Sequence, residues 1–205
     1  MDYNKLFRYT NPRKVLDIGA HIGSFTQQVL RFNPDAKVIM IEANPNCEPY
    51  LSKLNIPYQM VALSKEKGEA ELYVEKVNEI GTGASLYREN TEYYADDKFD
   101  TVKVQTEALD SLNYFEDEFI DLVKLDVQGA EYDILEGGRK TILRSGHVLI
   151  EVSLLEYNLG APQIEHIVNK MKEYGFVIED ILDYQRSSEN ILFQLDLLFK
   201  NSYIY

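Results

Sequence analysis

The residues best suited to chemistry follow two apolar runs near the start of the chain. Asp17 ends the first run and opens a turn that extends from Gly19 to Gly23, and Glu42 ends the second run. In an open α/β sheet, the first turn between a strand and a helix borders a nucleotide-like ligand. An acid at the end of the second strand accepts hydrogen bonds from ribose hydroxyls. The pattern therefore predicts a site for an adenosine-containing ligand.

The spacing of glycines in this turn does not suit a diphosphate. Gly19 and Gly23 lack between them the middle glycine of the G-x-G-x-x-G motif, which lets a pyrophosphate approach the backbone. The Asp17 carboxylate would repel phosphate and attract a cation. S-adenosylmethionine, which carries an ammonium, a sulfonium and a ribose diol, fits this turn better than NAD does. The simpler alternatives are a turn without a ligand and, for Glu42, a solvated strand end.

A later apolar run, residues 119–127, contains Lys124 and Asp126. Alternation along a strand places both side chains on one face, and a buried lysine needs an acidic partner. The pair could be purely structural. It could also serve catalysis at the carboxyl edge of the sheet, since a reaction between two substrates needs positioning and is helped by a base. Asp126 is the first choice for that base, and neutral Lys124, Glu151 and His21 are the alternatives.

Apolar segments alternate with helical segments along most of the chain. Continuous apolar runs are typical of strands that are covered on both faces. Strands are expected at 14–18, 37–41, 58–63, 119–127, 148–152, 176–181 and 191–199. Helices are expected from 24, around 50–54, and at 108–114, 130–135 with a second turn to 143, and 162–174. We therefore predict an α/β fold with a doubly wound, mostly parallel sheet of seven strands, the last two antiparallel.

The chain is expected to form a single domain over residues 1–205. Residues 1–12 are interpreted as a polar lead-in with one helical turn. Residues 64–107 interrupt the alternation with two half-exposed strands around a long polar segment. Because long inserted segments in compact domains are usually functional or disordered, we predict a small β element and a substrate lid here.

Composition excludes several classes of partner. The net charge of −13 argues against binding to nucleic acid or to an anionic membrane surface. Cys47 is the only cysteine, which rules out an intrachain disulfide and a cysteine-rich zinc site. The polar start and the lack of a long apolar run predict a cytoplasmic protein. No set of acids has a telling spacing, so no metal is expected, and the oligomeric state is left open.

Seven short stretches together resemble the FkbM-type family of class I S-adenosylmethionine-dependent methyltransferases. They occur in that family's order, at 16–23, 41–45, 61–64, 109–110, 123–131, 151–153 and 196–199. The stretch that begins at Lys124 and ends at Glu131 is the most specific. One departure is His21, where such proteins often carry asparagine. The resemblance implies a Rossmann-like fold and methylation of hydroxyl groups, often on sugars or polyketide-derived products.

The expected site follows from the motifs and this resemblance together. The cofactor-binding residues are predicted to be Asp17, Gly19, Ala20, His21, Gly23, Ser24, Phe25, Glu42, Ala43, Asn44, Val61, Ala62, Leu63 and Asp126. Catalysis is assigned to Asp126 and Lys124. The sugar or other hydroxyl-bearing acceptor is expected to contact Ser85, Tyr87, Gln128, Glu131, Glu151 and Tyr157. The alternatives are an NAD-dependent oxidoreductase, disfavoured by the missing glycine, and a catalytically silent cofactor-binding domain, disfavoured by the Lys124–Asp126 pair.

Overall fold

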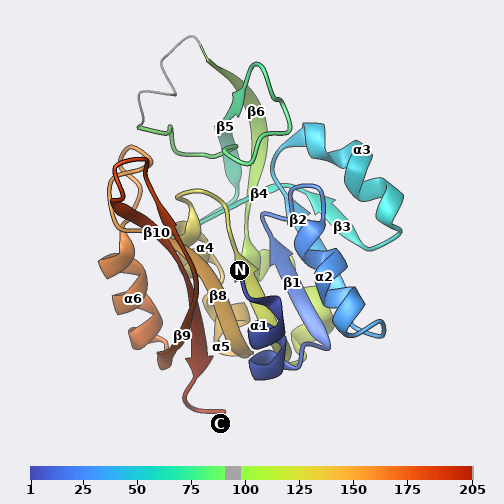
Figure 1. Ribbon diagram of the computed structural model, residues 1–205. Coiled ribbons are helices and arrows are strands. Elements are labelled where there is room, and N and C mark those ends of the chain that lie inside the picture. Colours follow the sequence, from blue (N-terminus) through green and yellow to red (C-terminus); the bar gives the residue numbers. More distant parts are fainter. Residues whose placement is uncertain (91–97, 205) are drawn as a thin grey trace.

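The apolar runs form the centre of a sheet in the computed structural model, which describes residues 1–90 and 98–204. The strands of this sheet are β1 (Lys14–Ile18), β2 (Lys37–Glu42), β3 (Tyr58–Met60), β7 (Ile120–Leu125), β8 (Ser145–Ser153), β9 (Phe176–Arg186) and β10 (Leu192–Asn201). Their order is β3-β2-β1-β7-β8-β10-β9 (Figure 1). The first five are parallel, and β10 is antiparallel to both β8 and β9. The predicted sheet is confirmed.

Helices cover both faces of this sheet because successive side chains on each strand point to opposite faces. In β1, Val15 joins one apolar cluster, whereas Leu16 and Ile18 join the other. The first cluster is completed by α1 (Tyr3–Thr10), α2 (Ser24–Phe32) and α3 (Glu48–Leu51). The second is completed by α4 (Glu131–Gly137), α5 (Arg139–Leu143) and α6 (Ile164–Glu173). Short 3-10 turns lie at Pro45–Cys47, Ser52–Leu54, Leu109–Ser111 and Tyr114–Asp117.

A second sheet lies beyond the carboxyl ends of the parallel strands (Figure 1). It consists of β4 (Ala62–Ser64), β5 (Gly68–Glu75) and β6 (Phe99–Ala108), in the order β4-β6-β5. The expected small β element is therefore present. The expected single strand over 58–63 is divided, because the chain leaves β2 after Met60 and Ala62 pairs with Thr106 of β6 instead.

Other sequence expectations were wrong in extent, among them β9, which extends to Arg186 and not to residue 181. The lead-in is a helix of eight residues whose Leu6 and Phe7 are buried against the sheet. The Phe7 ring lies 6.3 Å from the Phe25 ring and 5.2 Å from the Phe32 ring, centroid to centroid. The helix expected at 108–114 is replaced by the two 3-10 turns, because Asn113 adopts a left-handed conformation between them.

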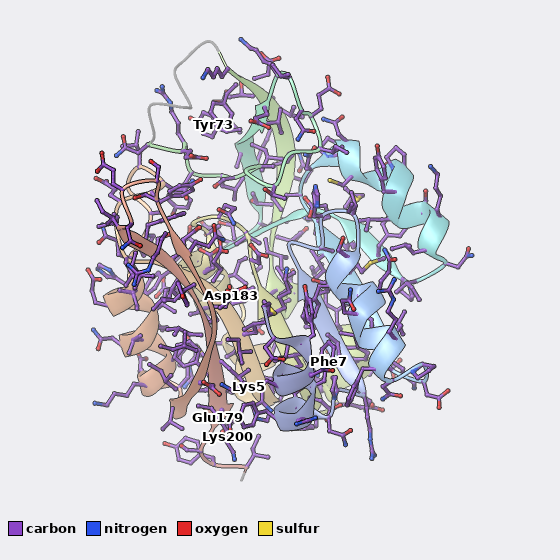
Figure 2. The ribbon with its side chains drawn as sticks, viewed as in Figure 1. Lys5, Phe7, Tyr73, Glu179, Asp183 and Lys200 are labelled. Carbon is purple, nitrogen blue, oxygen red and sulfur yellow. The ribbon has the colours of Figure 1, made fainter. Side chains whose placement is uncertain are left out.

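The amino end of the large sheet carries a separate charged cluster. Glu179 and Lys200 lie at the opposite end of the molecule from Tyr73 in the small sheet (Figure 2). His147 is buried there, with its Nε2 3.1 Å from an oxygen of Glu179. This cluster therefore lies away from the strand ends at which a site is expected. No helix in the described ranges is long and apolar enough to cross a membrane.

Replacing Phe7 tests the packing of α1. The change Phe7→Ala should lower the free energy of unfolding by about 3–5 kcal/mol, because it removes a buried ring. Urea denaturation followed by circular dichroism measures the loss. Phe32→Ala is the control: its side chain is 45% exposed, so its cost should be less than half as large. Equal costs for the two variants would contradict the buried position of α1.

Candidate active site

The turn after β1 is shaped by a close approach to the end of β7. Gly19 has a φ of 74°, and a Cβ atom added there would lie 1.8 Å from the carbonyl oxygen of Asp126. The backbone nitrogens of Gly19 and Ala20 donate to the carbonyl oxygen of Ile41, over 3.0 and 3.1 Å. Only glycine combines this left-handed conformation with such limited space. The turn therefore joins the carboxyl ends of β1, β2 and β7.

A cavity of about 220 Å³ lies against this turn. Its wall includes twelve of the expected cofactor residues, namely Gly19, Ala20, His21, Ser24, Phe25, Glu42, Ala43, Asn44, Val61, Ala62, Leu63 and Asp126. Asp17 and Gly23 are not part of the wall. Gly23 has a φ of 80° before α2, and a Cβ there would lie 2.3 Å from the side chain of Leu54. Gly23 therefore allows the chain to turn into α2 close to Leu54.

Asp17 lies beneath the turn, which differs from the expectation that it borders a ligand. It is fully buried, and the Thr26 hydroxyl donates to its Oδ2 over 2.6 Å. Its Oδ1 lies 3.5 Å from the ammonium of Lys124. Burial raises the pKa of Asp17, and the nearby Lys124 ammonium opposes that rise. The Asp17 carboxylate therefore helps to fix the position of the Lys124 ammonium from the buried side of the turn.

Lys124 is the cation at the centre of the site. It is in register with Asp17 on the neighbouring strand, and its ammonium lies 3.2 Å from Oδ2 of Asp126. It also donates to the carbonyl oxygen of Gly19 over 3.1 Å. Burial alone would lower the pKa of Lys124, but the two carboxylates raise it above the usual lysine value. The two carboxylates thus favour the charged form of Lys124 and disfavour its alternative role as a neutral base.

Glu42 is held at the cavity wall by backbone groups. Its Oε2 accepts a hydrogen bond from the nitrogen of His21 over 2.7 Å, and its Oε1 accepts one from the nitrogen of Asn44 over 2.8 Å. Burial raises its pKa, and these bonds oppose the rise. A carboxylate has about four acceptor positions. Glu42 therefore retains acceptor capacity for the hydroxyls of a ligand.

Part of the inserted segment closes over the cavity, and we call residues 79–86 the strap. His21 Nε2 lies 2.5 Å from the carbonyl oxygen of Ile80 in the strap, so this nitrogen carries the proton. Asn44 donates its side-chain amide to the carbonyl oxygen of Glu79 over 2.7 Å. The Ser85 hydroxyl donates to the carbonyl oxygen of Gln128 over 2.5 Å. The strap thus connects the ends of β1, β2 and β7.

The strap and the small sheet also contribute wall residues that sequence reasoning missed. They are Leu72, Gly81, Thr82, Ala84 and Leu86. Met1, Tyr3, Ile18, Ile41, Val127 and Ala130 complete the missed set. Alternation in β5 could have identified Leu72 as inward-facing. Nothing in the sequence pattern pointed to Tyr3, because its position depends on how α1 docks.

Two of the expected acceptor residues, Gln128 and Glu151, adjoin Asp126. The Gln128 side-chain nitrogen donates to Oδ1 of Asp126 over 3.1 Å and to Oε1 of Glu151 over 2.6 Å. Gln128 lies on the cavity wall, as does Ser85. Glu151 lines a small adjoining depression that it shares with residues of β9 and β10.

The other three expected acceptor residues do not reach the cavity wall. Glu131 accepts hydrogen bonds from the backbone nitrogens of Val127 and Gly129, over 3.0 and 2.9 Å, and burial raises its pKa to about 7. The Tyr87 hydroxyl donates to Asp133 over 2.7 Å, and the Tyr157 ring stacks on Phe193 at 5.6 Å between centroids. Glu131, Tyr87 and Tyr157 therefore support the loops around the cavity. Among the described residues, no three His, Cys, Asp or Glu side chains gather to hold a metal ion.

The doubly wound sheet and the glycine turn, with a cavity at the strand ends, define a class I methyltransferase fold. Residues 17–178 match the Methyltransferase FkbM domain, and the chain belongs to this family. The methyl donor of the family is S-adenosylmethionine. A relative named 2-O-methyltransferase NoeI, from Sinorhizobium fredii (strain NBRC 101917 / NGR234), is 25% identical over 178 residues. The match covers 80% of this chain and 73% of NoeI.

Solved structures share the fold at lower identity. Methyltransferase FkbM from Methylobacillus flagellatus KT superposes with a TM-score of 0.59 at 14% identity, covering 93% of this chain and 44% of that one. The chain thus spans less than half the length of that protein. The N-terminal domain of EvdMO1 with SAH bound superposes with a TM-score of 0.55 at 9% identity. That match covers 97% of this chain and 79% of the EvdMO1 domain.

Adding a methyl group at Gly19 tests the geometry of the turn. Gly19→Ala should weaken binding of S-adenosylhomocysteine, measured by calorimetry, by more than about tenfold, or 1.4 kcal/mol. The reason is that the new Cβ would displace the Asp126 backbone. Gly160→Ala is the matched control, since Gly160 has a φ of 73° with nothing within 4 Å of a Cβ. It should cost about 1–2 kcal/mol of stability and leave binding unchanged. Unimpaired binding by Gly19→Ala would refute this geometry.

Proposed function

We propose that this chain transfers the methyl group of S-adenosylmethionine to a hydroxyl oxygen of a sugar. The observation that carries the proposal is the position of Asp126. Its carboxylate lies on the cavity wall at the end of β7, and Lys124 and Gln128 hold one oxygen each. A carboxylate fixed in this way at the strand ends is suited to accept the proton of an acceptor hydroxyl.

The cavity wall fits the proposed cofactor. Glu42 has acceptor capacity for the ribose hydroxyls, and Val61, Leu63 and Leu72 give an apolar surface for adenine. The turn at Gly19 would hold the methionine part beside the Lys124 cluster. At about 220 Å³ the cavity is just below the roughly 300–1,000 Å³ of small-molecule sites. The acceptor would lie beside Asp126, where Ser85 of the strap contacts Gln128.

The protein's own residues would act by positioning and by proton acceptance. When bound, S-adenosylmethionine supplies an electrophilic methyl group with a good leaving group. Asp126 accepts the hydroxyl proton as the acceptor oxygen becomes an ether. Lys124, which stays charged, fixes the Asp126 carboxylate and donates no proton. Positioning of this kind contributes a large part of the rate of a two-substrate reaction.

Two relatives support an oxygen acceptor on a sugar. NoeI is named a 2-O-methyltransferase. A structure of the EvdMO1 N-terminal domain was obtained in the presence of SAH and D-fucose, with a TM-score of 0.54 to this chain. The net charge of −13 is consistent with an acceptor that carries no phosphate.

The proposal is tested with the purified chain, labelled S-adenosylmethionine and a panel of methyl glycosides. Mass spectrometry should find one added methyl group, and fragmentation should place it on an oxygen. Methylation confined to nitrogen or carbon acceptors would reject an O-methyltransferase. Consumption of the methyl donor without any glycoside product would reject a sugar acceptor.

Asp126→Asn is the direct test of the proposed base. The amide cannot accept the hydroxyl proton, so kcat should fall by about 10²–10⁴-fold. Binding of S-adenosylhomocysteine should persist through Glu42 and the turn, which the change leaves untouched, although Asp126 itself borders the cavity. Asp35→Asn, at an exposed position after α2, is the control and should have wild-type kinetics. Turnover near the wild-type rate in Asp126→Asn would eliminate Asp126 as the base.

A further inference from the structure

Glu151 is surrounded by acidic groups at the carboxyl end of β8. It is in register with Asp196 on the antiparallel strand β10. The depression beside it is lined by Asp183 and Tyr184 of β9, and the Asp183 carboxylate pairs with the amino group of Met1. Like charges placed directly opposite each other on paired strands are destabilising. A second ionised carboxylate at position 151 would therefore be costly.

The partners of Glu151 are carboxamides. Its Oε1 accepts hydrogen bonds from the side chains of Gln128, over 2.6 Å, and Gln194, over 2.9 Å. Its Oε2 accepts a longer hydrogen bond, 3.3 Å, from the side-chain nitrogen of Gln185. Among the described residues, no lysine, arginine or histidine lies within ion-pair distance of Glu151. Carboxamides are neutral donors, so no cation fixes Glu151 as an anion opposite Asp196, and a proton would lie on Oε2, whose hydrogen bond is the longest of the three.

The electrostatic environment of Glu151 also favours its neutral form. Burial, followed by the charges of Asp126, Asp196 and Glu131, raises the pKa of Glu151 to about 9. Asp196 is itself affected, since burial and the charges of Asp126 and Asp183 raise its pKa to about 6. Lys124 does not offset these effects at Glu151, because its ammonium pairs with Asp17 and Asp126.

Gln128 connects this neutral group to the proposed base. One side-chain nitrogen of Gln128 donates to both Asp126 and Glu151, so the two carboxyl groups lie one amide apart. A sugar that presents one hydroxyl to Asp126 would direct its neighbouring hydroxyl toward Glu151. An uncharged donor in that place would bind a hydroxyl and would not compete with Asp126 for the acceptor proton.

We propose that Glu151 remains protonated and donates a hydrogen bond from Oε2 to the hydroxyl adjacent to the one that is methylated. The acceptor class is then an uncharged sugar with a vicinal diol. This role rests on the proposed O-methyltransferase function. The protonation state of Glu151 can be measured without any acceptor, so the two proposals can fail separately.

The kinetic test compares Glu151→Gln with Glu151→Ala, using methyl glycosides that have or lack the adjacent hydroxyl. Because an amide also donates a hydrogen bond, Glu151→Gln should keep kcat/KM within about threefold of the wild type at pH 7. Glu151→Ala should lose about 10–100-fold, mainly through KM. The deoxy glycoside should remove the difference between the wild type and Glu151→Ala. A Glu151→Gln variant as impaired as Glu151→Ala would overturn the proposal, because an ionised carboxylate would then be required.

The pH dependence supplies a signature that a structural role would not give. Wild-type kcat/KM should decline above about pH 9, the value to which the pKa of Glu151 is raised. Glu151→Gln should lack this decline, while Gln185→Ala, which removes the long Oε2 contact, should keep it. An alkaline decline of equal size in Glu151→Gln would overturn the assignment.

The stability test needs no acceptor. A carboxyl group whose pKa is raised by folding stays protonated in the native state while the unfolded chain ionises, so it destabilises the protein as pH rises between its unfolded and folded values. The Tm of Glu151→Gln relative to the wild type should therefore increase from about pH 5 to pH 9. A Tm difference independent of pH would show that Glu151 is ionised and would reject the proposal. An increasing difference without glycoside methylation would reject only the proposed function.

Discussion

The structure of the site depends on one buried cation, the ammonium of Lys124, between Asp17 and Asp126. Burying a charge is costly unless partners replace the lost hydration. Here the partners come from β1, from the end of β7 and from the carbonyl oxygen of Gly19. The ammonium therefore ties the glycine turn to the proposed base. Removing the carboxylate of Asp17 or of Asp126 would leave the Lys124 ammonium only partly paired. The effects of the two acids on the site are therefore coupled through Lys124.

The inserted segment completes the cavity that the large sheet begins. The sheet supplies the turn and the acids Glu42 and Asp126, whereas the small sheet and the strap supply Leu72 and Ser85. Side-chain hydrogen bonds from His21 and Asn44 hold the strap to the ends of β1 and β2. Each such bond contributes about 0.5–1.5 kcal/mol, and the strap has few of them, whereas β5 pairs with β6 along its whole length, Gly68–Glu75.

Local pattern was sufficient for most strands of the large sheet and for the glycine turn. A short continuous apolar run such as residues 37–42 predicts a strand that is covered on both faces. The carboxyl ends of such parallel strands then meet at one edge of the sheet. Long-range packing was not predictable. α1 is built from a mostly polar sequence, and only docking on Phe25 gives Leu6 and Phe7 their buried positions. Asp17 was identified as important, but its burial was not predicted, because the pattern does not show that Thr26 and Lys124 contact its carboxylate.

The carboxyl groups around the cavity show why residue type alone does not define chemistry. Glu42 and Glu131 each accept two backbone N–H groups, which stabilise a carboxylate, while burial favours the neutral acid. Asp126 has an ammonium and a carboxamide as partners. Glu151 has carboxamides, with Asp196 opposite it. An ammonium favours ionisation and a neighbouring acid opposes it. In the proposed reaction, the two carboxyl groups joined by the Gln128 side chain therefore have opposite roles: Asp126 accepts a proton and Glu151 keeps one.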